Sequence, residues 1–236
     1  MLRFLFLVLS ALLTACASPR AVAPMSMPTS PAPNSVAIPY LALGDSYTIG
    51  EGAPVTDRWP VQLTTLANAE GLALASPDII ARTGWTTAEL QDAIVASGNH
   101  RTDYGLVSLL IGVNNQYRGQ SVDLYRAQFR QLLATAVGYA GGRAGRVVVL
   151  SIPDWGQTPF AHDRDAAQIA REIDLFNAVA QAECQAAGVA YVPITDLTRA
   201  AAGDARQFTT DGLHYTGLQM QQWASRALPV VRGLLK

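Results

Sequence analysis

The alternation of short apolar runs with longer amphipathic segments is the feature that most limits what this chain can fold into. Runs of strand length occur at 36–43, 78–81, 104–111, 146–152 and 189–194. The segments between them repeat apolar residues at intervals of three and four, which predicts helices with one apolar face. Strands that alternate with helices form parallel βαβ units covered by helices on both faces. The sequence therefore predicts a three-layer α/β/α fold with a central parallel sheet of about five strands.

Two of the predicted helices have clear boundaries. The segment 121–140 is amphipathic and ends in a glycine-rich stretch around Gly141. The segment 165–187 begins with Asp165 and is followed by Gly188, a residue typical of the position just beyond a helix. Ligands of such sheets bind beyond the carboxyl ends of the strands, so we expect the functional residues there.

The first fifteen residues have the organisation of a bacterial secretory signal. Arg3 provides a positive start, and an apolar run follows from Phe4 to Leu9. This stretch is about half of the roughly 20 residues that a membrane-spanning helix needs, so we expect cleavage rather than a permanent span. The junction LTAC at 13–16 resembles a lipobox, in which Cys16 becomes the lipidated N-terminus. An ordinary cleavage site with an incidental cysteine is the alternative.

A linker follows over residues 16–35, with five prolines among small and polar residues. In an extended conformation it could hold a domain some tens of ångströms from a membrane. The globular domain is then expected over residues 36–236. Ala17, rather than aspartate, follows Cys16, which by resemblance to enterobacterial lipoproteins favours the outer membrane. We therefore expect a protein of the bacterial cell envelope, attached to the membrane through the lipid on Cys16.

The charge and the metal-binding residue types exclude several functions. Lysine and arginine total 17 against 18 aspartates and glutamates, so the chain has no basic excess with which to bind nucleic acid. No HExxH motif or clustered His/Cys spacing is present, and we expect neither a metal nor a cofactor. If Cys16 is lipidated, Cys184 has no disulfide partner, and its alanine-rich surroundings predict a buried, inert thiol.

The first candidate functional motif is Gly44-Asp45-Ser46, directly after the first apolar run. Aspartate and serine are also ordinary residues for a turn or a helix cap. The chain has no GxSxG motif, so the nucleophile turn of the α/β-hydrolase fold is not indicated.

The second motif places Asp211 three residues before His214, in a loop that precedes the last predicted helix. A serine hydroxyl becomes a good nucleophile when a base takes its proton, and a carboxylate can hold that base in the required tautomer. The alternative is that both residues only help to begin the helix, which Thr216 and Gln219 are expected to cap.

Two further motifs follow predicted strands. Gly112 and Asn114 come directly after the third, and an asparagine side chain at such a position can donate a hydrogen bond to an oxyanion. Gly84 follows the second, just before a capping box predicted over Thr86–Glu89, and a glycine lets the backbone N–H approach a ligand closely. Turn formation alone could also explain each motif.

Together, and in this order, the four motifs resemble the characteristic blocks of the GDSL/SGNH hydrolase family. The resemblance implies that Ser46 is the nucleophile, His214 the general base, and Asp211 the residue that orients His214. It also implies an oxyanion hole made by the backbone N–H groups of Ser46 and Gly84 and the side-chain amide of Asn114. The fold expected from the resemblance is the flavodoxin-like fold of SGNH hydrolases.

The sequence departs from the family pattern at Asn115, where the family commonly has aspartate, and this raises the question of how that loop is held. The resemblance extends over 36–236 and implies a hydrolase of carboxylic esters that forms an acyl-serine. We expect the pocket to be lined by 47–52, Trp85, 116–118 and 152–160.

The rings of the last segment favour small-acyl or aryl esters as substrates. The alternatives are a lysophospholipase or lipase, a carbohydrate deacetylase, an acyltransferase, and a non-catalytic lipid-anchored binding protein. The expected partners are accordingly a small-molecule ester or a lysolipid, together with the membrane.

Overall fold

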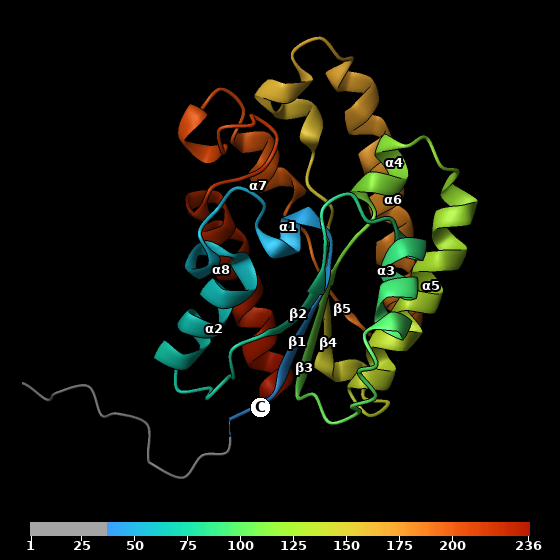
Figure 1. Cartoon of the computed structure of the whole chain (residues 1–236), viewed down its shortest axis with the longest axis vertical. Helices are drawn as coiled ribbons and strands as arrows, with labels where there is room; N and C mark the ends of the chain where they lie inside the picture. Colours follow the sequence, from blue (N-terminus) through green and yellow to red (C-terminus); the bar gives the residue numbers. More distant parts are fainter. Residues whose placement is uncertain (1–36) are drawn as a thin grey trace, which may run out of the picture. The chain divides into compact units, whose positions relative to one another are not determined.

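Five short strands form the sheet at the centre of the structure, a computed structural model that describes residues 37–236 (Figure 1). All neighbouring strands are parallel, and their order across the sheet is β2-β1-β3-β4-β5. The strands are β1 (Tyr40–Gly44), β2 (Asp78–Ala81), β3 (Leu106–Leu110), β4 (Val147–Leu150) and β5 (Ala190–Val192). This is the strand order of flavodoxin-like doubly wound sheets, and it confirms the predicted fold class.

The ends of the strands differ from the sequence prediction. Only β2 has the predicted bounds, and the other four strands begin later than predicted. For β1 the cause is Pro39, which has no N–H to donate to a neighbouring strand. Ile38, before this proline, makes only an isolated bridge with Leu74. The continuous ladder therefore starts at Tyr40.

Helices cover both faces of the sheet, which Figure 1 shows nearly edge-on. One face is covered by α2 (Trp59–Ala69) and α8 (Gly217–Leu235), and the other by α3 (Thr87–Ala96), α5 (Val122–Tyr139) and α6 (Ala166–Ala187). The connections contain the short helices α1 (Ser46–Ile49), α4 (Val113–Tyr117) and α7 (Thr195–Ala200), and 3₁₀ turns at Val55–Asp57, Ala144–Arg146, Trp155–Gln157, Pro159–Ala161 and Ala205–Gln207.

The core lies on both sides of the sheet. Every residue of β1, β3 and β4 is buried, as expected for parallel strands that are covered on both faces. On one side α8 packs against α2, and Trp59 of α2 and Trp223 of α8 are both fully buried. On the other side the buried thiol of Cys184 in α6 is free. Its burial raises the pKa of the thiol to about 12, which keeps it protonated and unreactive.

The helix ends follow the cap residues that the sequence indicates. The Ser121 side chain accepts a hydrogen bond from the third residue of α5, and Asp165 does the same for α6. Gly188 ends α6 in the left-handed conformation, with φ of 68°. Thr86 and Glu89 form the predicted capping box at the start of α3. These contacts fix the loops that precede α3 and α5, which lie at the carboxyl edge of the sheet.

The cap predicted for the last helix is wrong. Thr216 is the residue before α8, but its side chain makes no capping hydrogen bond and instead donates to the carbonyl oxygen of Arg206. Gln219 is 1% exposed and its amide lies among buried groups, so it does not reach back to the start of the helix. Burial of the side chain has overridden the local sequence pattern here.

The predicted signal segment 1–15, the lipidation site Cys16 and the linker 16–35 lie outside the described residues. Within residues 37–236, no helix is both long enough and apolar enough to cross a membrane.

Candidate active site

Ser46 lies in a tight turn at the carboxyl end of β1, where it begins α1. Asp45 fixes the turn, because its carboxylate accepts a hydrogen bond from the backbone N–H of Tyr47 at 3.0 Å. Gly44 is required just before it: a Cβ there would lie 2.5 Å from the carbonyl oxygen of Leu110. As the first residue of α1, Ser46 has a backbone N–H without a partner inside the helix. Both its hydroxyl and its N–H are thus held at the carboxyl edge of the sheet.

His214 is held by Asp211 in the loop before α8. The imidazole Nδ1 lies 2.6 Å from Oδ2 of Asp211. The other carboxylate oxygen accepts hydrogen bonds from the backbone N–H groups of Leu213 and His214 and from the hydroxyl of Thr209, at 2.8–2.9 Å. A carboxylate at Nδ1 favours the tautomer with its proton on that nitrogen, which leaves Nε2 free to accept one.

These contacts also set the charge of Asp211. Partial burial alone would raise the pKa of its carboxyl group. The hydrogen bonds from His214, Leu213 and Thr209 outweigh that effect and hold the pKa well below its usual range. Asp211 therefore carries a full negative charge beside the imidazole at neutral pH.

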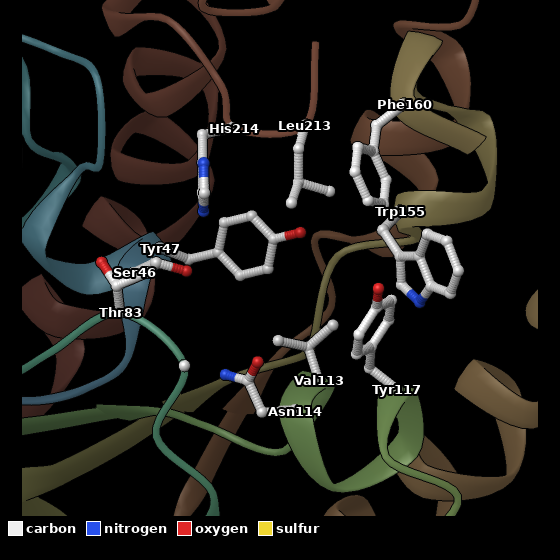
Figure 2. Close-up of a pocket in the computed structure, with 11 residues that line it drawn as sticks. Ser46, Tyr47, Thr83, Val113, Asn114, Tyr117, Trp155, Phe160, Leu213 and His214 are labelled. Carbon is white, nitrogen blue, oxygen red and sulfur yellow. The ribbon is translucent and has the colours of Figure 1, made fainter. Parts of the chain in front are cut away.

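A cavity of about 170 Å³ joins the predicted residues at the carboxyl edge of the sheet (Figure 2). It is lined by Ser46, Tyr47, Thr83, Gly84, Val113, Asn114, Tyr117, Trp155, Phe160, Leu213 and His214. Figure 2 shows the ring of His214 pointing towards Ser46 at one end, while aromatic and aliphatic side chains line the other end. Asp211 stands behind His214 and does not line the cavity.

Asn114 lies across the cavity from His214 (Figure 2), and Gly84 also lines the cavity. Asn114 is in α4, and its amide Nδ2 donates to the carbonyl oxygen of Trp85 at 2.9 Å. The amide group has a second hydrogen, and Figure 2 shows its nitrogen pointing towards the Ser46 end of the cavity. Gly84, in the loop after β2, has φ of 84°, a conformation that favours glycine. The structure thus brings the three residues with the predicted donor groups to one cavity.

Asn115 answers the question that the sequence raised about its loop. It is fully buried, and its Oδ1 accepts a hydrogen bond from the backbone N–H of Thr87 at 3.1 Å. Its Nδ2 donates to the hydroxyl of Thr87 and to the side-chain oxygen of Gln120, at 2.7 and 2.8 Å. An aspartate would accept the first of these bonds but could not donate the others unless it were protonated. The asparagine thereby links α4 to the start of α3.

The predicted pocket segments are only partly correct. Tyr47, Tyr117, Trp155 and Phe160 line the cavity, whereas Trp85 does not and contributes its carbonyl oxygen to Asn114 instead. Three lining residues were missed: Thr83, Val113 and Leu213. The signal for them was their position directly beside Gly84, Asn114 and His214 in the sequence.

Hydrogen bonds outside the cavity hold its aromatic wall, which consists of Tyr117, Trp155 and Phe160. Trp155 packs edge-on against Tyr117 with ring centroids 5.2 Å apart and lies 6.3 Å from the ring of Phe160. The indole Nε1 donates to the side chain of Gln116 at 2.7 Å, and Gln116 in turn donates to Glu172 of α6 at 2.7 Å. The indole is therefore fixed, although its surroundings in the cavity are mainly apolar.

The sequence matches the model of the GDSL-like lipase/acylhydrolase family over residues 42–221. No curated protein has significant sequence similarity to the chain.

Solved structures share the fold. TesA is 18% identical, with 83% of this chain and 98% of that chain covered and a TM-score of 0.64. A lipase/acylhydrolase from Enterococcus faecalis is 19% identical, with 83% and 96% covered and a TM-score of 0.61. A phospholipase A1 from Streptomyces albidoflavus NA297 is 23% identical, with 84% and 99% covered and a TM-score of 0.55.

The family match is extensive enough to decide membership. It runs from β1 through the loop of His214 into α8, and so spans all four of the sequence motifs. The chain therefore belongs to the GDSL-like lipase/acylhydrolase family, a family of hydrolases, esterases and lipases.

Proposed function

We propose that this protein is a serine ester hydrolase that cleaves carboxylic esters with a small acyl or aryl group. One observation carries the proposal. Ser46 and the imidazole of His214, which Asp211 holds, line the same end of one mainly apolar cavity (Figure 2). A nucleophile, an oriented base and an apolar pocket are the parts that acyl transfer to serine requires.

In the acylation step, Ser46 Oγ bonds to the ester carbonyl carbon while Nε2 of His214 accepts the hydroxyl proton. The carbonyl oxygen becomes an oxyanion, to which the N–H groups of Ser46 and Gly84 and the amide of Asn114 donate hydrogen bonds. The bond to the alcohol oxygen then breaks, and Nε2 returns the proton to the leaving alcohol. The charge of Asp211 stabilises the imidazolium between these two transfers.

In the deacylation step, a water molecule takes the place of the alcohol. The oxygen of the water bonds to the acyl carbon while Nε2 of His214 accepts a proton from the water. The same three donors hold the second oxyanion, and the proton passes from Nε2 to Ser46 Oγ as the acid leaves. The protein itself supplies every group that these steps use, apart from the ester and water.

The dimensions of the cavity support a small acyl group. Trp155 and Phe160 limit the cavity at the end away from Ser46, which favours a short chain or a single ring over a long chain. The mainly apolar lining favours hydrocarbon over a sugar.

Hydrolysis of 4-nitrophenyl acetate, butyrate and octanoate by the purified full chain tests the proposal. We expect the highest kcat/KM with acetate or butyrate, because Trp155 and Phe160 stand in the path of a longer chain. A folded chain that is inactive on all three esters contradicts the proposal. Preference for octanoate, with hydrolysis of a lysophosphatidylcholine, would indicate a lysophospholipase instead, and ester formation with an added alcohol would indicate an acyltransferase.

Replacing Asn114 with alanine removes one of the three oxyanion donors. Loss of such a donor lowers kcat by about 10²- to 10³-fold, and we expect a loss of this size for Asn114→Ala with butyrate as substrate. Asn68→Ala is a matched control, because Asn68 also donates its amide to a backbone carbonyl, that of Leu74, but lies in α2 and does not line the cavity. Equal rates for the two variants would show that Asn114 is not a donor.

Phe160 closes the cavity on one side and is itself 38% exposed. Its other side faces a neighbouring hollow lined by His162, Arg164 and Gly212. Phe160→Ala should join the two spaces and raise the ratio of octanoate to butyrate kcat/KM by about tenfold. Leu175→Ala, which also removes an exposed apolar side chain but on α6, should leave the ratio unchanged. A Phe160→Ala ratio within twofold of the wild type would mean that Phe160 does not limit chain length.

A further inference from the structure

Tyr47 is a buried cavity residue whose hydroxyl the mechanism above does not use. Its side chain is 2% exposed, and its ring is held on several sides. The centroids of His214, Tyr215 and Trp223 lie 5.8, 5.7 and 6.1 Å from that of Tyr47, the first and last in edge-on geometry. Packing of this kind leaves one orientation for the ring and therefore one direction for its hydroxyl.

The hydroxyl of Tyr47 points into the cavity. In Figure 2 the ring extends from the Ser46 end, and its oxygen is directed towards the space between Leu213 and Trp155. Within residues 37–236 this hydroxyl has no hydrogen-bond partner, although other buried tyrosines do: Tyr40 is bonded to Ser108 at 2.9 Å. A phenylalanine would fill the same space. The hydroxyl of Tyr47 therefore adds a polar group to the cavity, and no described residue forms a hydrogen bond with it.

The hydroxyl has a proton that it can donate. Burial, reinforced by the nearby Tyr215, Asp45 and Asp154, raises the pKa of the Tyr47 phenol well above its usual value. The group therefore keeps its proton at every pH at which the protein would be assayed. A neutral phenol beside apolar walls offers its hydrogen to an oxygen of whatever occupies the pocket.

The position of Nε2 of His214 decides whether the acyl part or the alcohol part of an ester lies beside Tyr47. Nε2 of His214 must reach the leaving oxygen, so the alcohol part lies on the His214 side of Ser46. The acyl part then extends past Tyr47 towards Trp155 and Phe160, at the other end of the cavity (Figure 2). An oxygen in the acyl chain would then lie on the side of the cavity into which the Tyr47 hydroxyl points.

We propose that Tyr47 is a specificity-determining residue whose hydroxyl donates a hydrogen bond to an oxygen in the acyl chain of the substrate. The inference rests on the proposed function and narrows its substrate class. The preferred esters are those of short oxygen-bearing acids, such as alkoxy, hydroxy or keto acids, rather than of plain alkanoic acids. The Tyr47 hydroxyl would thus select for an oxygen in the acyl chain, although the other side chains around it in the cavity are mainly apolar.

Two pairs of 4-nitrophenyl esters isolate this contact. Methoxyacetate and butyrate differ only by an oxygen in place of a methylene, and so do 3-methoxypropanoate and pentanoate. The measured quantity is the ratio of kcat/KM for the oxygen-bearing ester to that for its alkyl partner, in the full-chain wild type and in Tyr47→Phe. The intrinsic reactivity of each ester is the same for both proteins, so it cancels when the two ratios are compared.

We expect Tyr47→Phe to lower the ratio about five- to tenfold for at least one pair, the loss typical of an uncharged hydrogen bond. Tyr139→Phe is the matched control, because its hydroxyl donates to the carbonyl oxygen of Asn99 outside the cavity, and its ratios should equal those of the wild type.

Ratios unchanged within twofold in Tyr47→Phe would overturn the inference while leaving the ester hydrolase intact. A loss in Tyr117→Phe but not in Tyr47→Phe would also overturn it, by assigning the contact to the other tyrosine of the cavity. If the wild type hydrolyses none of the four esters, the proposed function fails, and the inference about Tyr47 fails with it.

Discussion

Replacing Ser46 with alanine is expected to abolish ester hydrolysis, with kcat for 4-nitrophenyl butyrate reduced about 10⁴-fold or more. The substitution removes the atom that forms the acyl intermediate in the proposed mechanism, and the remaining donors can then only assist attack by water. Circular dichroism should show an unchanged fold, because the turn depends on Gly44 and on the contact between Asp45 and the N–H of Tyr47, neither of which uses the serine hydroxyl.

A covalent probe makes this result independent of any particular ester. A fluorophosphonate should add its mass to the wild-type chain and to Ser225→Ala, which removes an exposed serine of α8. It should leave Ser46→Ala unmodified. Labelling of Ser46→Ala, or hydrolysis by it at more than a hundredth of the wild-type rate, would show that another residue is the nucleophile.

The second large effect is expected for Asp211→Asn, a loss of kcat of about 10³- to 10⁴-fold. Asparagine can keep its oxygen towards the N–H groups of Leu213 and His214, which places its NH₂ group against Nδ1. An amide donor there requires Nδ1 to accept, so the imidazole proton moves to Nε2. The ring then has no lone pair facing Ser46, although every side chain has kept its place.

The control for Asp211→Asn is Asp123→Asn, the same change at an exposed position in the first turn of α5. It should retain the wild-type kcat. Retention of more than a tenth of the activity by Asp211→Asn would mean that the loop itself orients His214 without the carboxylate.

Strand positions could be predicted because parallel strands buried on both faces leave apolar runs in the sequence. β2 has the predicted bounds, and β1, β3, β4 and β5 all lie where such runs occur. Their ends could not be predicted, because the end of a ladder depends on what the neighbouring strand offers. The ladder of β1 begins only after Pro39, because this residue has no N–H to donate to a neighbouring strand.

The candidate site divides in a similar way. Ser46, Gly84, Asn114 and His214 could be placed at strand ends or in the following loops from short motifs, and the structure brings them to one cavity. The wall of that cavity could be predicted only in part. Phe160 lies in a segment that is expected to line it, whereas Leu213 was missed, because no local pattern records that two segments so far apart in the sequence line one cavity.

Local patterns also mislead where burial competes with them. Thr216 and Gln219 have the spacing of a capping pair, but the side chain of Gln219 is buried in the core and does not cap the helix. Thr86 and Glu89, with the same spacing, form their box, because Glu89 stays near the surface, where Arg118 also contacts it. Sequence spacing alone does not distinguish these two cases.

The placement of Ser46 directly after the first strand and of His214 just before α8 has a consequence for biosynthesis. A ribosome completes the sheet, with its nucleophile, before it makes the base. The loop of His214 leads into α8, which packs against α2, an element that precedes β2 in the chain. A nascent chain that has not yet reached His214 therefore lacks the proposed base, and we expect ester hydrolysis to begin only after α8 has packed against α2.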